Sequence, residues 1–292
     1  MGEFLRALGE HAFLQSALVA GLLASVACGV VGTYVVVKRI GYLAGGISHA
    51  VLGGMGAAYF LGADPMGGAL AAALLAAALT GWVTLRRREQ EDTLISAIWA
   101  VGMALGVLFI SRTPGYSVDL MSYLFGNILM VRVRDLWVMA GVNAAILGTV
   151  ALLYKQFLAV CFDEELARLR GVPVELTYLT LLALVAVTVV ILIKVVGLIL
   201  VIALLTLPAA IARQYVTTLP AMMVVSALLG GLFTSGGLTL SYGPDLPAGS
   251  TMVVVAGTAY LLSTLVGPLR KRAVQWGAQR RREGCQTDRD AL

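Results

Sequence analysis

The residue best suited to chemistry is His49, which interrupts an apolar, glycine-rich stretch between Gly41 and Gly56. Imidazole is a common ligand for zinc, manganese and iron in proteins. A polar group inside lipid is costly unless it is paired or faces water. Two interpretations fit this position. Either His49 lines a path through a membrane and holds a metal ion in transit, or it is hydrogen-bonded between helices, with Ser48 beside it.

Single carboxylates near the ends of apolar segments are the next candidates. Asp119 precedes the stretch Leu120–Asn127, and Asp245 lies in the turn-rich stretch Ser241–Gly249. Each could attract cations to the mouth of a path or contact a partner, and each could equally cap a turn. Lys194 stands between two apolar runs. A lysine at a membrane boundary is expected to extend its amine into water.

A short charged segment, Phe162–Pro173, has the pattern of an amphipathic helix. Asp163 is a typical N-cap residue, the acidic residues after it suit a helix start, and Gly171 suits a helix end. Apolar residues recur at spacings of four and three, on one face of the helix; they are Phe162, Leu166 and Leu169. The pattern fits a helix lying on lipid headgroups, and it fits a docking helix for a soluble partner.

The elements that must position these residues are long apolar helices. Of the 292 residues, 59% are hydrophobic and 13% are charged, and the mean hydropathy is +0.90. A soluble domain carries about 25% charged residues, and a run such as Phe13–Val37 is long enough to span the hydrocarbon layer. We therefore expect an all-α, polytopic transmembrane helix bundle of about eight or nine spans. Nine crossings are placed at about 13–37, 43–61, 67–85, 94–111, 135–154, 175–193, 195–212, 219–240 and 250–267.

Basic residues mark one side of this bundle. With nine crossings the basic loops all fall on one face, at 38–39, 86–88, 155–170, 213 and 270–272. The positive-inside rule makes this face the cytoplasm. We expect a multi-pass protein of the cell (inner) membrane, with its N-terminus outside and its C-terminus in the cytoplasm. Because the net charge of +5 lies in these loops and the tail, the expected partner is membrane lipid and not nucleic acid.

Two parts of the chain do not fit the pattern of spans. The stretch 117–131 is apolar in part but too short to cross as a regular helix, so it is either re-entrant or interfacial. Residues 273–292 form a polar cytoplasmic tail beyond a single transmembrane domain, residues 1–272. The chain lacks the phosphate-binding GxxxxGK[ST] loop and the HExxH and GxSxG motifs. We expect neither an enzyme nor a permanently bound cofactor.

Five motifs, in order, resemble those of one family: the permease subunits of ATP-binding-cassette importers for zinc, manganese and ferrous iron. The resemblance runs from about Val30 to Val266. The matched positions are Tyr42, His49, Ala50 and Gly54; then Ser122 to Gly126; then Phe162, Asp163, Ala167, Gly171 and Val172; then Gly197 to Ala210; and finally Asp245, Pro247, Gly249 and Thr251.

The resemblance implies an architecture similar to that of the vitamin B12-type importer permeases. It implies a metal-binding role for His49. Asp119 is a second candidate ligand, and the predicted topology places Asp245 at the outer face, where it could contact a partner. It also implies a coupling helix at about 162–172 that docks onto an ATPase. The coupling residues would be Phe162, Asp163, Glu164, Ala167, Leu169 and Gly171.

One position departs from the family pattern at the chemistry itself. The family usually carries an aspartate four residues before the histidine, one helical turn away, where carboxylate and imidazole could share a divalent cation. Here that position is Gly45. Either another carboxylate substitutes, with Asp119 the candidate, or the metal is held less tightly in transit.

The expected function is that of the membrane-spanning subunit of an ATP-driven importer for a divalent transition metal ion, zinc first, then manganese or iron(II). The implied partners are ABC ATPase subunits, an extracytoplasmic metal-binding protein and a second permease subunit, an identical copy in a homodimer. Two alternatives remain open. One is a proton- or sodium-coupled secondary transporter, which would need ionisable residues inside the spans. The other is a permease for iron-siderophores or cobalamin.

Overall fold

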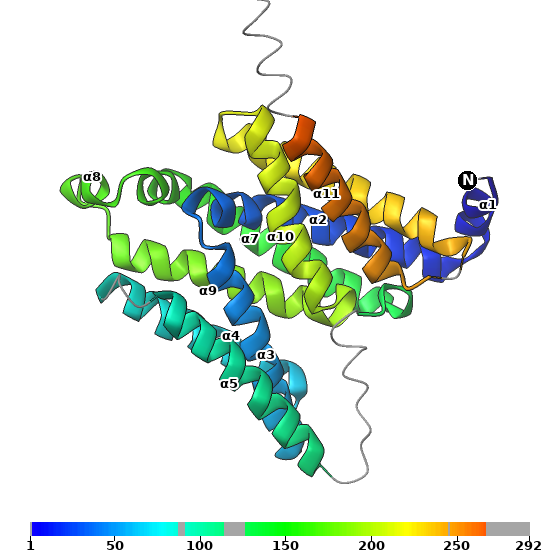
Figure 1. The fold of residues 1–292 in the computed structure, drawn as a ribbon, viewed down its shortest axis with the longest axis horizontal. Helices are drawn as coiled ribbons and strands as arrows, with labels where there is room; N and C mark the ends of the chain where they lie inside the picture. Colours follow the sequence, from blue (N-terminus) through cyan, green and yellow to red (C-terminus); the bar gives the residue numbers. More distant parts are fainter. Residues whose placement is uncertain (1, 87–90, 114–125, 245, 267–292) are drawn as a thin grey trace, which may run out of the picture.

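The structure of the protein is a computed structural model that describes residues 2–86, 91–113, 126–244 and 246–266, and these residues form helices and connecting turns (Figure 1). The helices are α1 (Gly2–Glu10), α2 (Ala12–Lys38), α3 (Gly41–Phe60), α4 (Pro65–Arg86), α5 (Glu91–Arg112), the single 3-10 turn η2 (Ile128–Met130), α7 (Val133–Phe162), α8 (Glu164–Leu169), α9 (Val174–Val196), α10 (Leu198–Tyr215) and α11 (Leu219–Tyr242). A last helix covers Ala248–Val266.

The predicted all-α membrane bundle is confirmed. Eight of the described helices are long and apolar enough to cross a membrane. The ninth expected crossing corresponds to α3, whose 20 residues include His49 and many glycines and which is not one of those eight helices. Boundaries differ most at α7, whose 30 residues extend well beyond the expected 135–154. Phe162, expected inside the amphipathic helix, is instead the last residue of α7.

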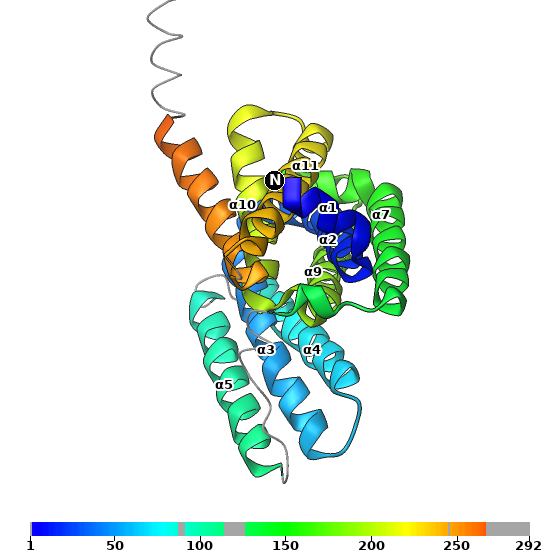
Figure 2. The ribbon, with the colours of Figure 1, turned by 90° about the vertical axis from the view of Figure 1, so that its right-hand side faces the viewer.

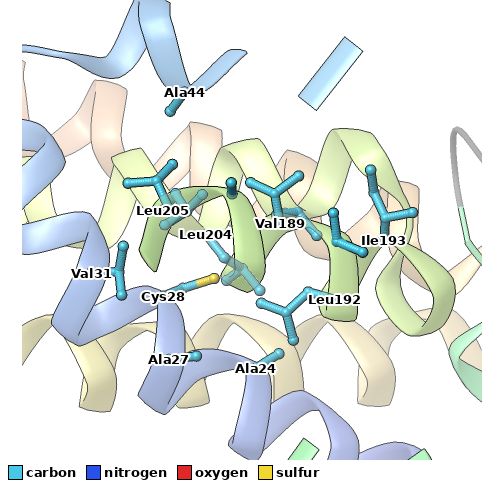
Figure 3. Packing of buried hydrophobic residues seen from close by; sticks show 14 of the residues in the cluster. Ala24, Ala27, Cys28, Val31, Ala44, Val189, Leu192, Ile193, Leu204 and Leu205 are labelled. Carbon is cyan, nitrogen blue, oxygen red and sulfur yellow. The ribbon is translucent and has the colours of Figure 1, made fainter. Parts of the chain in front are cut away.

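The helices form two groups (Figure 2). Helices α3, α4 and α5 pack mainly on one another, while α2 packs on α7, α10 and α11. Helix α9 joins the groups, because it contacts α4 on one side and α2, α7 and α10 on the other. Its contact with α2 and α10 is a dense apolar core, in which Cys28 lies close to Leu204 and Leu192 (Figure 3). This core gives the α3–α5 group a fixed support.

Successive spans run in alternate directions and give the bundle two distinct ends. Helix α8 lies at one end, and α1 lies at the other (Figure 1). At the α8 end, Lys38 contacts Glu164, and Arg213 donates a hydrogen bond of 3.0 Å to the carbonyl of Val36. Lys38 and Arg213, both expected in basic loops of one face, therefore lie at the same end of the bundle as α8.

Part of the stretch 117–131, which is expected to be re-entrant or interfacial, lies outside the described residues. Its described portion ends in the short turn η2, preceded by Gly126 with a φ of +69°. The backbone at Gly126 lies against that of Val196 and Gly197, leaving no room for a side chain. The end of this segment is thus attached to the junction between α9 and α10.

Helix α3 packs against α5 by direct backbone contact through glycines. A Cβ atom on Gly53 would lie 2.7 Å from the carbonyl oxygen of Gly102, and one on Gly56 would lie 2.7 Å from that of Gly106. Small residues let membrane helices approach in this way. The close approach fixes which side chains of α3 and α5 meet.

We expect Gly53→Ala to destabilise the protein by about 1–3 kcal/mol. The new methyl group would clash with the backbone of α5, which can move away only if the whole helix shifts. Gly141→Ala on α7 is the matched control, since a Cβ there meets nothing within 4 Å, and alanine favours a helix by up to about 1 kcal/mol. Thermal unfolding of both purified variants in detergent measures the difference. Equal midpoints would contradict the packing argument.

Candidate functional site

His49 lies near the middle of α3, packed against α5. The residue is 8% exposed, and its Nδ1 atom has no hydrogen-bond partner among the described residues. Its imidazole stacks on the indole of Trp99, with 4.1 Å between ring centroids and 13° between planes. Ser48 does not bond to it, because the Ser48 hydroxyl donates to the carbonyl of Ala44 at 2.7 Å. No hydrogen bond within the described chain therefore engages the Nδ1 atom.

Trp99 was not identified from the sequence. Its Nε1–H donates to Sδ of Met103 at 3.2 Å, and its ring lies 6.1 Å from that of Tyr42. The Tyr42 and Ser96 hydroxyls form a hydrogen bond of 2.6 Å between α3 and α5. A polar and aromatic strip thus follows the contact between these two helices. Only the register of the α3–α5 packing reveals it, since Tyr42 and Trp99 are far apart in sequence.

The carboxylates predicted for the site, Asp119 and Asp245, lie outside the described residues, and their roles stay predictions. In the part of the chain that the structure describes, no three or more histidine, cysteine, aspartate or glutamate residues gather into a metal-binding group. His49 is consequently the only predicted metal ligand whose surroundings are known.

The predicted charged helix is present as α8. The Asp163 carboxylate accepts a hydrogen bond of 2.9 Å from the backbone N–H of Leu166, as expected of an N-cap. Gly171 has a φ of +76°, a conformation that favours glycine, and its N–H donates to the carbonyl of Arg168. Sequence reasoning therefore identified both ends of this helix correctly.

The apolar residues of the α8 region point away from the protein. Leu169 is 85% exposed and Phe162 69% exposed, while Leu166 is partly exposed. Ala167, by contrast, is fully buried and packs α8 onto the bundle. Of the predicted coupling residues, those accessible to a partner are Phe162, Asp163, Leu169 and Gly171, with Glu164 partly so. An apolar surface at the basic end of the bundle is available for contact.

Lys38 ties α8 to the end of α2. Its Nζ donates to the carbonyl of Val160 at 2.8 Å and forms an ion pair with Glu164, and both side chains are largely buried. The next residue, Arg39, has a φ of +63° and turns the chain into α3. His49 follows about 12 Å along that helix. Glu164 of α8 is thus linked, through Lys38 and the turn at Arg39, to the start of the helix that contains His49.

We expect Lys38→Met to weaken the coupling between α8 and the bundle, because Glu164 loses its ion-pair partner. An ion pair of about 1 kcal/mol corresponds to about a fivefold effect. The measurement is the number of ATP molecules hydrolysed per ion transported in proteoliposomes, which should rise. Lys155→Met is the control, since Lys155 is exposed and at the same end. Equal ratios in the two variants would argue against a transmitting role.

A second ion pair joins the spans at the opposite end. Nζ of Lys194, at the end of α9, lies 2.8 Å from Oδ1 of Asp135, at the start of α7. The Lys194 side chain is 55% exposed, as expected of a lysine at the membrane boundary. The pairing with Asp135 was not predicted, because the two residues are brought together only by the packing of α7 on α9.

Comparison with known proteins places this architecture in a family. The model of the ABC 3 transport family matches residues 10–267. An uncharacterised membrane protein of Synechocystis sp. is 47% identical, over 87% of this chain and 90% of its own. A probable metal transport system membrane protein of Chlamydia pneumoniae is 42% identical, over 87% of this chain and 88% of its own. The manganese transport system membrane protein MntC of Listeria monocytogenes is 34% identical, over 91% and 94% of the two chains.

A solved structure agrees. A chain of PsaBC from Streptococcus pneumoniae, determined in complex with a Fab, superposes with a TM-score of 0.81 at 34% identity, covering 90% of this chain and 94% of that one. A putative metal-chelate type ABC transporter in an inward-facing conformation shares the fold, with a TM-score of 0.70 at 15% identity. The chain therefore belongs to the ABC 3 transport family, and it is built as a permease subunit of an ATP-binding-cassette transporter.

Proposed function

We propose that this chain is the membrane-spanning subunit of an ATP-driven importer that carries a divalent transition metal ion into the cell. The observation that carries this proposal is α8, a capped helix whose apolar residues are exposed at the basic end of the bundle. Such a surface suits a soluble partner. The ion pair of Glu164 with Lys38 connects α8 to the end of α2, and the turn at Arg39 joins α2 to the helix that contains His49. ATP hydrolysis would take place in a separate ATPase subunit docked there.

His49 is the proposed contact for the ion in transit. Among the buried residues that the structure describes, His49 is the only one whose side chain is acidic, basic or an imidazole. A site of moderate affinity is appropriate, because an ion held too tightly would not be released.

The ion proposed is zinc, manganese or iron(II). The relatives named for manganese or for metal transport support a metal ion as the class of substrate. Imidazole suits zinc, manganese and iron, so His49 is compatible with all three. The transported ion is the substrate, and we propose no resident cofactor.

The proposed partners follow from the two ends of the bundle. ATPase subunits would bind at α8, and an extracytoplasmic metal-binding protein would deliver the ion at the opposite end, near the ion pair of Lys194 with Asp135. A second permease subunit, an identical copy, would complete the path. In this arrangement the N-terminus lies outside and the α8 end faces the cytoplasm.

The burial pattern disfavours secondary transport driven by protons or sodium. Such a carrier needs ionisable residues at mid-membrane to bind the coupling ion. In the described spans, the other buried polar side chains are neutral hydroxyls and one amide, that of Asn143. With His49 as the only buried ionisable group of its kind, coupling to an ATPase is the better-supported source of energy.

The test is transport by the complete importer. The chain is purified with its ATPase and reconstituted in proteoliposomes together with its metal-binding protein, and uptake of zinc, manganese and iron(II) is followed with and without ATP. We expect co-purification of the ATPase and uptake that depends on ATP. Uptake that persists without ATP but collapses with the proton or sodium gradient would instead favour a secondary transporter.

A further inference from the structure

The indole of Trp99 lies across two positions of α3 that are one helical turn apart, Gly45 and His49. It stacks on the imidazole at a centroid distance of 4.1 Å. A Cβ atom on Gly45 would lie 3.7 Å from Cζ3 of the same ring. No other atom counted as a neighbour in the described chain would lie within 4 Å of that Cβ. Residues four apart share one helix face. The same ring therefore stacks on the imidazole and lies within van der Waals distance of any side chain placed at position 45.

Among the described residues, no group of three or more histidine, cysteine, aspartate or glutamate side chains gathers around the imidazole. The indole donates its N–H to the Met103 thioether, and position 45, the one best placed to add a ligand beside His49, is glycine. Imidazole nitrogen suits borderline ions such as zinc, whereas manganese prefers carboxylate oxygens. The His49 residue is 8% exposed, and its buried Nδ1 has no hydrogen-bond partner among the described residues. This atom is the nitrogen that would contact the ion.

We propose that Trp99 sets the ion preference at His49. By stacking on the imidazole it fixes the orientation of the ring, and by covering position 45 it keeps oxygen ligands away, so the path favours zinc over manganese. Trp99 is thus a specificity-determining and positioning residue. The inference rests on the proposed function, because it takes His49 to contact the ion.

The test is a double-substitution cycle at positions 45 and 99. Binding of Zn²⁺ alone and of Mn²⁺ alone is measured by equilibrium dialysis on the purified permease–ATPase complex. We expect the unaltered complex to bind zinc more tightly. Trp99→Ala should weaken zinc binding about fivefold, the value of one aromatic stack. Gly45→Asp alone should change manganese binding little, because the indole occupies the approach to the imidazole.

The decisive result is the combined variant. With the ring gone, the new carboxylate can reach an ion at His49, so Gly45→Asp with Trp99→Ala should bind manganese about tenfold more tightly than the two single effects together predict. The control pair is Gly45→Asp with Trp137→Ala, since Trp137 is 74% exposed on α7; its effects should be additive. If Gly45→Asp does not fold, Gly45→Ser supplies a shorter oxygen ligand for the same cycle.

A fluorescence measurement separates the two ways of failing. The chain has four tryptophans, so replacing Trp82, Trp137 and Trp276 by phenylalanine leaves Trp99 as the only emitter. Zinc should alter its emission, and His49→Ala should abolish that change. If zinc binds without either effect, His49 is not the site and the proposed site fails as well. If the signal depends on His49 but the cycle is additive, or manganese binds more tightly than zinc, only the role of Trp99 is overturned.

Discussion

Replacing His49 by alanine is expected to lower metal uptake by the complete importer at least about tenfold. The residue is buried within α3, and its Nδ1 has no hydrogen-bond partner in the described chain. Removing it deletes the proposed nitrogen ligand while breaking no hydrogen bond of that atom within the described chain. A tenfold loss corresponds to about 1.4 kcal/mol, a modest value for a metal ligand. Uptake of zinc and of manganese in proteoliposomes is the measurement.

Two controls separate this loss from a defect of folding. The chain has a second histidine, His11, which is exposed and stacks on Phe13 near the N-terminus. His11→Ala should leave uptake unchanged. Ser48→Ala changes the residue next to His49 and removes only a bond to the carbonyl of Ala44. Unaltered uptake and unaltered ion preference in the His49 variant would exclude a ligand role for this residue.

Replacing Gly171 by tryptophan is expected to uncouple ATP hydrolysis from uptake. A side chain at this position meets nothing within 4 Å inside the chain, so the bulk of an indole would project from the α8 surface toward any protein docked there. We expect coupled uptake to fall at least about tenfold, because residues near the centre of a protein–protein interface carry most of its binding energy. ATPase activity and uptake are measured on the same proteoliposomes, and the uncoupled variant should still appear in the membrane.

The control for this variant must share its backbone strain. Gly171 has a φ of +76°, and a residue with a Cβ in this region costs about 1–2 kcal/mol. Asparagine tolerates the conformation better than other side chains. Gly171→Asn therefore introduces the strain without the bulk, and it should retain coupling. If both variants transport normally, α8 is not the docking surface.

The spans and the ends of α8 were predictable because local chemistry decides them. A long uncharged stretch such as Leu176–Ile193 has few alternatives to a membrane helix. Asp163 and Gly171 start and stop α8 through bonds within a few residues of themselves. The exposure of Leu169 also follows from its place on one face of that helix. The roles of Asp119 and Asp245 remain predictions, because these residues lie outside the described structure.

Contacts between distant segments were not predictable in the same way. Lys38 and Glu164 are 126 residues apart, and Lys194 and Asp135 are 59 apart. Each pair depends on the rotation and height of one span against another. The sequence identified Lys38 as a loop residue and Lys194 as a boundary residue. It did not indicate the partner of either one.

The sequence by itself determined a bundle of membrane helices, the buried histidine in α3 and the capped helix α8, because apolar length and capping chemistry act locally. The tertiary structure alone decided what surrounds His49. Glycines at 53 and 102 bring the backbones of α3 and α5 together, and this register places the Trp99 ring against the imidazole and over Gly45. Which side chains meet across a helix contact depends on interlocking shapes that no single segment of sequence encodes.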